Sequence, residues 1–445
     1  MVNLKPPKTA LKHFWIYAIA IGLIALFGRA TVLWYNTPVR IIVDEREYVT
    51  LAAQLNEDGT FRSTSAMPRK YQGGKPGDPT AYRSPVLPLI IAGHFRLFGP
   101  ALVYPRITLI LLSSITCVLL AVLGKNIGYP LAGLIAGAIW ALWPPVLFSF
   151  YSADRLITEN LGLFFLVGHV TILSMARRSP TAFRIILSGL FLGLAVLTRG
   201  YLLFVLPLMI IFVALWDVKR RRQMALLFAL SAVILPGVWV TRNWIVLGKP
   251  VLSTQTDHFY LGNNLWARGS FDGDIFKLGY EAPQFKVIIE RHPNVWEMSE
   301  IERSEMWSQE AINAVVSNPA HFGWLLMRKT LVFWAPTQSW SSGFYRWHYA
   351  LAILLPFAVL GIYINLRRGL KQEMLLLLLP IAAVFLSALL TYALDRYRFV
   401  IEPLIVLLGA IGMAECVGWL YSRARSTERQ PSADNELRAA SSTFE

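Results

Sequence analysis

The feature that most constrains this chain is a series of long apolar runs separated by polar segments. The first run, from Phe14 to Tyr35, has about 22 residues, enough at about 1.5 Å of rise per residue to cross a hydrocarbon core of about 30 Å. Since 55% of the 445 residues are hydrophobic and 16% are charged, a water-soluble enzyme is excluded. About ten membrane spans are predicted, at residues 14–35, 102–123, 129–148, 157–175, 183–198, 200–216, 224–247, 347–366, 373–394 and 399–420.

The distribution of charge predicts the orientation of these spans. The 42 Lys and Arg against 27 Asp and Glu give a net charge of +15, which in a soluble protein would suggest nucleic acid. Most of this excess lies in alternate short loops, which by the positive-inside rule face the cytoplasm together with both termini. We therefore expect anionic membrane lipids, and no nucleic acid, as partners of these residues. The clusters are Lys5, Lys8 and Lys12, then Lys125, then Arg177, Arg178 and Arg184, then residues 219–222, then Arg367, Arg368 and Lys371, and finally Arg423 and Arg425.

The predicted organisation is a single all-α polytopic membrane domain in the cell (inner or plasma) membrane. A cytoplasmic N-terminus (1–13) precedes the transmembrane domain (14–420), and a polar tail (421–445) is expected to be disordered in the cytoplasm. The first run reads as an uncleaved anchor. Two nearly neutral loops, 36–84 and 248–346, face the periplasm. Cys117 and Cys416 both fall within spans, so a stabilising disulfide is not expected.

Some segments of the outer loops do not fit as spans. Residues 85–98 and 321–336 are apolar but carry His94 and Arg96, and Arg328 and Lys329, respectively. We expect both to be helices at the outer membrane surface, where basic side chains reach the headgroups. Residues 270–320 are typical of soluble helix, and we expect Glu300, Glu302, Glu305 and Glu310 to form its solvated face.

Ionisable residues near the spans gather on one side of the predicted membrane. Except for His169, which we expect to be a core histidine bonded to a neighbouring span, all map to the outer third of a span or to an outer turn. A proton or ion pathway needs polar groups at several depths, so this one-sided set favours a site at the periplasmic surface, with snorkelling and ion pairing between helices as the alternative for single members. The set comprises Arg29, Arg106, Asp154, Arg155, Glu159, Arg199, Arg242, Asp395, Arg396, Arg398 and Glu402.

The first outer loop holds the best chemical candidate. Asp44 and Glu45 stand at the start of a segment in which Tyr48, Leu51 and Leu55 repeat at helical spacing. Glu47 lies three residues after Asp44, so the alternative is that Asp44 only caps the helix in a capping box. Later in the loop, Arg83 re-enters the interface and would face headgroup phosphates, with an ordinary interfacial anchor as its alternative.

Several short motifs, in order, carry a resemblance to a known family. They are Asp44-Glu45, Thr80-Ala81-Tyr82-Arg83-Ser84-Pro85, Leu156-Ile157-Thr158-Glu159-Asn160-Leu161, Leu197-Thr198-Arg199-Gly200, Arg242-Asn243-Trp244, Gly248-Lys249-Pro250-Val251 to Gly262-Asn263-Asn264, and Arg396-Tyr397-Arg398-Phe399. This series, spread over residues 14–420, resembles the bacterial glycosyltransferase family 39 group. It is similar to protein O-mannosyltransferases and lipid A aminoarabinose transferases, which are polytopic enzymes of the GT-C fold.

The resemblance implies a chemistry. Such enzymes move a sugar, hexosyl or pentosyl, from a polyprenyl-phosphate donor to a periplasmic protein, lipid or glycan acceptor, usually with inversion. Such a donor needs no nucleotide-binding domain, and the sequence has no phosphate loop and no Gly-x-Gly-x-x-Gly motif. The reaction needs a base for the acceptor hydroxyl and cations for the departing phosphate.

Carried over by position, the resemblance assigns roles to particular residues. Asp44 matches the position of the family's catalytic acidic residue and would act as the base, and Glu45 completes the acidic pair. Glu159 stands in the active-site region, with Asp154 as the nearby alternative. The expected donor-phosphate ligands are Arg83, Arg242, Arg199 and Arg398, with Arg242 preferred among the last three. A structural ion pair is the alternative for each of these three.

Other candidates are weaker. Tyr48, Tyr82, Asp154 and His258 are candidate substrate contacts, although a histidine beside aromatic residues is more often structural. No His/Cys cluster has metal-ligand spacing. No cofactor is firmly expected, although Asp44, Glu45 and Glu159 could together hold a divalent cation.

Two other functions stay open at this point. One is a ligase or polymerase that moves whole glycans from a polyprenyl pyrophosphate. The other is a transporter or flippase of lipid-linked sugars, which should need polar residues throughout the membrane depth, where only His169 offers one.

Overall fold

The protein, seen here as a computed structural model, is described over residues 12–36, 41, 43–63, 75–150, 152–216, 220–270, 278, 281–335 and 349–428. The described parts are helical apart from their connections. Their only β pairing is two isolated bridges, Arg62 with Pro79 and Ser270 with Ala393. The predicted N-terminal segment and polar tail lie outside these residues except for 12–13 and 421–428, and α20 continues through the latter to Glu428, where disorder was expected.

All ten predicted spans are helical, which makes the chain a multi-pass membrane protein. Two are shorter than a full span, namely α9 (Ala182–Thr198) and the pair η1 (Gly200–Phe204) and α10 (Val205–Ala214). The other eight are long and apolar enough to cross a membrane: α2 (Phe14–Tyr35), α5 (Val103–Asn126), α6 (Pro130–Ala141) with α7 (Pro144–Phe148), α8 (Thr158–Arg178), α11 (Arg221–Leu247), α17 (Tyr349–Arg367), α18 (Lys371–Leu390) and residues 402–421 of α20 (Glu402–Glu428).

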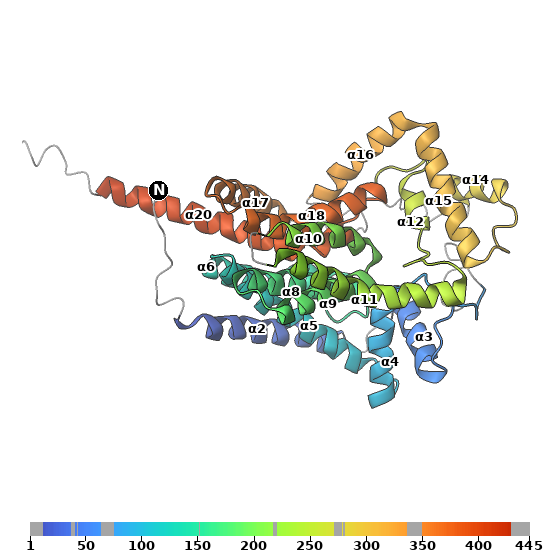
Figure 1. Ribbon diagram of the computed structural model, residues 1–445, viewed down its shortest axis with the longest axis horizontal. Helices are drawn as coiled ribbons and strands as arrows, with labels where there is room; N and C mark the ends of the chain where they lie inside the picture. Colours follow the sequence, from blue (N-terminus) through green and yellow to red (C-terminus); the bar gives the residue numbers. More distant parts are fainter. Residues whose placement is uncertain are drawn as a thin grey trace, which may run out of the picture.

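The remaining helices gather at one end of the bundle (Figure 1). Helix α4 runs across the ends of the spans there, as expected for a surface helix, and α16 occupies the second segment predicted to be one. The start of α2 and the end of α20 both lie at the opposite end (Figure 1). These helices are α3 (Val43–Glu57), α4 (Val86–Phe98), α12 (Asp257–Gly262), α14 (Pro283–Arg291), α15 (Glu300–Ser317), α16 (Pro319–Trp334) and α19 (Asp395–Phe399).

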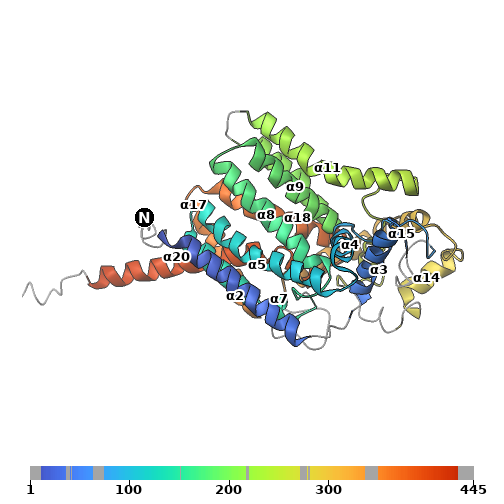
Figure 2. The same ribbon diagram turned by 90° about the horizontal axis from the view of Figure 1, so that it is seen from below.

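Helix α8 is the central span. Within the most apolar stretch of α8, 89% is buried, whereas the corresponding stretches of α2 and α11 are each 22% buried. It packs between α5 and α9, with α2 and α11 on the outside (Figure 2). Because α8 begins at the end of the bundle that carries the extra helices, its first residues lie beneath them.

Glycine lets several spans approach closely. A Cβ on Gly412 of α20 would collide with the carbonyl oxygen of Phe357 in α17, and one on Gly193 of α9 would lie 2.7 Å from the carbonyl oxygen of Ala232 in α11. Small residues at such crossings gain van der Waals contact where lipid supplies no hydrophobic drive for association. The bundle therefore provides a rigid base for the site at its end.

We expect the end with the extra helices to face away from the cytoplasm. In intact cells, a cysteine replacing the exposed Glu305 of α15 should react with a membrane-impermeant thiol reagent, and a cysteine replacing the exposed Arg222 of α11 should react only after permeabilisation. The background protein would carry Cys117→Ser and Cys416→Ser. Labelling of the residue 222 variant alone in intact cells would show the opposite orientation.

Candidate active site

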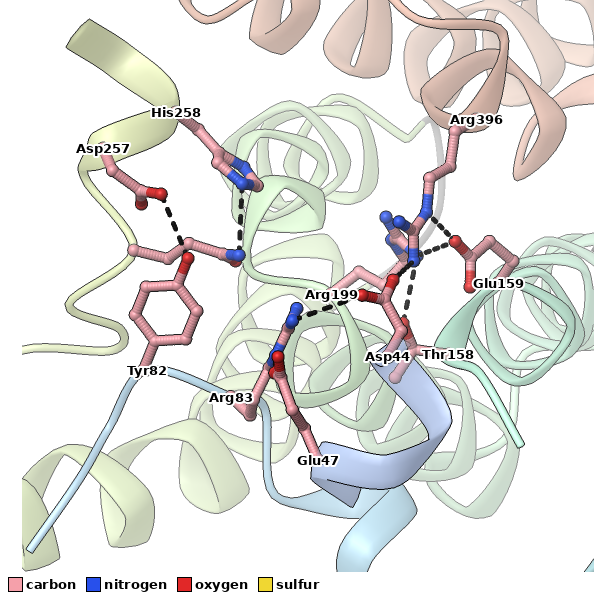
Figure 3. A network of polar contacts seen from close by, with 11 residues as sticks. Asp44, Glu47, Tyr82, Arg83, Thr158, Glu159, Arg199, Asp257, His258 and Arg396 are labelled. Atoms are coloured by element: carbon pink, nitrogen blue, oxygen red, sulfur yellow. Dashed lines mark hydrogen bonds and ion pairs between the residues drawn. The ribbon is translucent and has the colours of Figure 1, made fainter. Parts of the chain in front are cut away.

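Five charged side chains from distant parts of the chain meet at this end of the bundle (Figure 3). Asp44 lies in the first turn of α3, and Glu159 lies in the first turn of α8. Arg199 stands between α9 and η1, Arg396 is the second residue of α19, and Arg83 lies just before α4. The site therefore depends on the packing of four helices and one connecting segment.

Asp44 is held between two arginines. Its Oδ2 lies 2.8 Å from Nη2 of Arg396, and its Oδ1 lies 3.4 Å from Nη2 of Arg83. Burial raises the pKa of Asp44, but the charges of Arg396 and Arg83 outweigh this and bring the pKa to about 2. Because α3 begins at Val43, Asp44 lies inside the first turn rather than at the N-cap position that the alternative, a capping box, required. Glu47 forms an ion pair with Arg83.

Arg396 connects Asp44 to Glu159. Its Nε donates to Oε1 of Glu159, and Nη1 of Arg199 lies 2.9 Å from the same oxygen. Nη1 of Arg199 also donates to Oγ1 of Thr158 over 3.0 Å. The network thus contains three guanidinium groups and three carboxylates, counting Glu47, and is close to electroneutral.

The three guanidinium groups keep donors for a ligand. No described residue accepts a hydrogen bond from Nη1 of Arg83, Nη2 of Arg199 or Nη1 of Arg396. The side chains of Arg83, Arg199 and Arg396 keep 12%, 9% and 14% of their surface exposed. An anion with several oxygens could therefore reach all three arginines.

Aromatic rings lie against the guanidinium groups of two of these arginines, Arg83 and Arg199. The guanidinium of Arg83 lies 5.5 Å from the ring centroid of Tyr48 and 5.3 Å from that of Tyr82, and the guanidinium of Arg199 lies 5.0 Å from that of Tyr201. A guanidinium stacked on a ring still has its N–H groups free in its own plane. Tyr48 and Tyr82, which were predicted to contact the substrate, therefore contact Arg83 in the structure.

A second polar group faces this network across Arg83 (Figure 3). The hydroxyl of Tyr82 donates to Oδ2 of Asp257 over 3.0 Å, and Nδ1 of His258 lies 3.2 Å from the hydroxyl of Tyr397. Burial raises the pKa of Asp257 to about 7. Burial and the nearby charge of Arg83 lower the pKa of His258 to about 3, so this histidine is neutral.

The segment that carries Arg83 is anchored by two residues for which the sequence predicted other roles, Arg242 and Glu300. Arg242, the preferred phosphate ligand after Arg83, donates to the carbonyl oxygens of Thr80 over 2.8 Å and Phe61 over 2.9 Å. Glu300 is buried rather than solvated, and its Oε1 accepts from the backbone N–H of Ala81 over 2.7 Å. The structure thus makes both of them supports of the first outer loop.

Two further candidates, Glu45 and Asp154, lie apart from the network. Glu45 is fully buried, 3.0 Å from Nη2 of Arg106 and 3.4 Å from Nη1 of Arg155. Asp154 accepts a hydrogen bond from Ser152 and one from Asn36 over 3.5 Å.

Arg398, a third candidate that lies apart from the network, stabilises the fold. Its guanidinium is buried, lies 3.2 Å from Glu402 and donates to the carbonyl oxygens of Phe333 and Ala335. The structural ion pair, which was the alternative for Arg398, is therefore what the structure contains.

Asp44, Glu45 and Glu159, which the sequence suggested could together hold a divalent cation, do not come together in the structure. Glu45 points away from Asp44 into its own cluster, and Arg396 stands between Asp44 and Glu159. Among the described residues, no group of three or more His, Cys, Asp or Glu is arranged to hold a metal ion.

Sequence reasoning missed Arg396, Glu47 and Asp257 as site residues. Arg396 was among the outer ionisable residues, but Arg398 of the same motif was chosen in its place. Glu47 was considered only as part of a cap, although its spacing from Asp44 places the two on one face of a helix. For Asp257 the sequence offers only its position before His258.

Comparison with known proteins supports the fold. No family profile and no curated protein matches this sequence. The apo oligosaccharyltransferase of Archaeoglobus fulgidus superposes with a TM-score of 0.56 at 13% identity, over 93% of this chain and 52% of that one. The same organism's oligosaccharyltransferase AglB, in complex with an inhibitory peptide and a dolichol-phosphate, gives a TM-score of 0.50 at 14% identity, over 95% and 52%.

The chain therefore has the GT-C fold that was expected. It spans about half the length of the oligosaccharyltransferases that it matches. The ArnT of Cupriavidus metallidurans bound to undecaprenyl phosphate overlaps more weakly, with a TM-score of 0.39 at 13% identity over 92% of this chain and 78% of that one. The narrower resemblance to the family 39 group stays a prediction.

The neighbours Asp44 and Glu45 should respond differently to neutralisation. Glu45→Gln leaves the buried Arg106 and the half-buried Arg155 without their shared carboxylate. Removing one partner of a buried pair costs about 3–5 kcal/mol in other proteins. In Asp44→Asn, Arg83 keeps Glu47 and Arg396 keeps Glu159. Thermal unfolding in detergent should therefore show a much larger loss of stability for Glu45→Gln. Equal losses would contradict this division between a structural and a site carboxylate.

Proposed function

We propose that this chain is a membrane glycosyltransferase that moves a sugar from a polyprenyl-phosphate donor to an acceptor hydroxyl on the periplasmic side. The observation that carries the proposal is Asp44, held by Arg83 and Arg396 at the end of a GT-C bundle. This pairs a carboxylate with cations at one place, as base-assisted transfer from a phosphate requires. The AglB structure with a dolichol-phosphate adds support for a lipid-linked donor.

In this mechanism Arg83, Arg199 and Arg396 bind the donor phosphate through the donors that no described residue uses. Asp44 takes the proton of the acceptor hydroxyl while the oxygen of that hydroxyl attacks the anomeric carbon. The bond from this carbon to the phosphate oxygen breaks, and the phosphate leaves with the electron pair. Attack from the face opposite the phosphate inverts the anomeric carbon. The growing negative charge on the phosphate falls where the three guanidinium groups converge.

The charge balance of the site gives the donor a second role. Asp44 with a pKa of about 2 is a poor proton acceptor while both arginines contact it. A phosphate that draws Arg83 and Arg396 toward itself weakens these contacts, and the proton affinity of Asp44 rises. Donor binding would thus prepare the base. Glu159 keeps Arg199 and Arg396 in place beneath the phosphate.

Asp44→Asn should abolish sugar transfer while donor binding persists. The amide keeps the shape of the side chain but cannot accept a proton, and loss of a general base typically costs about 10²- to 10⁴-fold in rate. Purified protein in lipid nanodiscs would be assayed with a panel of polyprenyl-phosphate monosaccharides. Arg46→Gln, on the exposed face of the same turn of α3, is the matched control. Full activity of Asp44→Asn would sink the assignment of the base.

Transfer of a whole glycan is the second candidate, because two of the structures that superpose on the chain are those of an oligosaccharyltransferase. A polyprenyl-pyrophosphate oligosaccharide and a polyprenyl-phosphate monosaccharide, offered to the same reconstituted vesicles, would separate the two. We expect release of polyprenyl phosphate from the monosaccharide donor. Turnover of the oligosaccharide donor alone would favour the glycan ligase, and movement of intact lipid without sugar release would favour a flippase.

A further inference from the structure

Asp257 is a buried carboxyl group with an unused oxygen. It is the first residue of α12, and 3% of its surface is exposed. Tyr82 donates to its Oδ2 over 3.0 Å, whereas Oδ1 is buried and has no hydrogen-bond partner among the described residues. The N–H groups of residues 257 and 258 partly offset the rise in its pKa that burial causes, but neither has hydrogen-bond geometry to Oδ1. A buried acceptor without a donor costs free energy that a ligand could recover.

The position of Asp257 links it to the site. The ring of Tyr82 that binds its carboxyl packs on the guanidinium of Arg83, 5.3 Å from the ring centroid. The next residue, His258, packs against Tyr392 with 5.2 Å between ring centroids. Figure 3 shows Asp257, Tyr82 and His258 on one side of Arg83 and Asp44 on the other. A group bound between the phosphate ligands and this wall would lie against aromatic rings and close to the carboxyl group of Asp257.

This combination suits a sugar hydroxyl better than an amine. The charge of Arg83 is close enough to Asp257 to offset part of the rise in its pKa that burial causes. The same positive charge would repel an ammonium group. No described lysine or arginine forms an ion pair with Asp257, and the adjacent His258 is neutral. A neutral O–H can donate to Oδ1, while the C–H face of the sugar ring packs on an aromatic ring.

We propose that Asp257 determines sugar specificity by accepting a hydrogen bond from one hydroxyl group of the transferred sugar, with Tyr82 holding the carboxyl beside Arg83. The inference rests on the proposed function and deepens it, since it assigns the large outer loop to the sugar and the arginines to the phosphate. It also gives the unused Oδ1 a partner that is present only when the donor is bound.

The test uses the full-length protein in nanodiscs and the polyprenyl-phosphate monosaccharide that the wild type turns over, with its monodeoxy analogues. In Asp257→Asn the side chain keeps its shape and can still accept from Tyr82, but an NH₂ group that cannot accept replaces the other oxygen. We expect kcat/KM for the full sugar to fall about 10- to 100-fold, the range for a substrate hydrogen bond of about 1–3 kcal/mol. For one monodeoxy analogue, wild type and variant should be nearly equal.

Two further measurements make the result specific. Binding of polyprenyl phosphate without a sugar, followed by tryptophan fluorescence, should be unchanged in Asp257→Asn. Tyr82→Phe, which removes the hydrogen bond to Oδ2, should produce a smaller loss on the full sugar and the same equality on the same analogue. Glu305→Gln, on the exposed surface of α15, is the control and should behave as the wild type.

The outcomes separate the two proposals. Asp257→Asn with wild-type kcat/KM on the full sugar, or with equal losses on the sugar and on every monodeoxy analogue, would overturn the role of Asp257 while the glycosyltransferase stands. If the wild type neither turns over any donor nor binds polyprenyl phosphate, the proposed function fails and the role of Asp257 fails with it.

Discussion

The site depends on the guanidinium of Arg396, which contacts Asp44 and Glu159 together. These two carboxylates come from α3 and α8, and Arg396 comes from α19, so a single side chain joins three elements far apart in the sequence. Buried charges are tolerated only when they are paired and hydrogen-bonded. The balance of charge therefore fixes the geometry, and the same contacts place cations and a carboxylate next to each other.

Much of the fold could be predicted from the sequence, because a membrane imposes a length and an apolar composition on every helix that crosses it. All ten predicted runs are helical, and the two segments set aside as surface helices became α4 and α16. The end of α20 was misjudged because polar residues such as Arg423 allow a helix to continue beyond the apolar core.

The site could be predicted only in part. The sequence predicted Asp44, Arg83, Glu159 and Arg199 at one side of the membrane, and in the structure these four side chains lie together. The sequence could not separate adjacent residues, however. Consecutive residues of a helix are turned by about 100°, so Glu45 points into a different cluster from Asp44. Arg398, two residues from Arg396, faces Glu402. Which of two adjacent charges enters a site depends on helix rotation, and rotation is set by packing.

The anchoring of the Arg83 segment ties the two outer loops into one part. Thr80 and Ala81 are held by Arg242 at the end of α11 and by Glu300 of α15, and Thr254 of the large loop donates to the same carboxylate. The loops are therefore not interchangeable modules. Substitutions in the large loop must preserve these contacts, and a chimera that exchanges one loop with that of another protein must carry both sides of them.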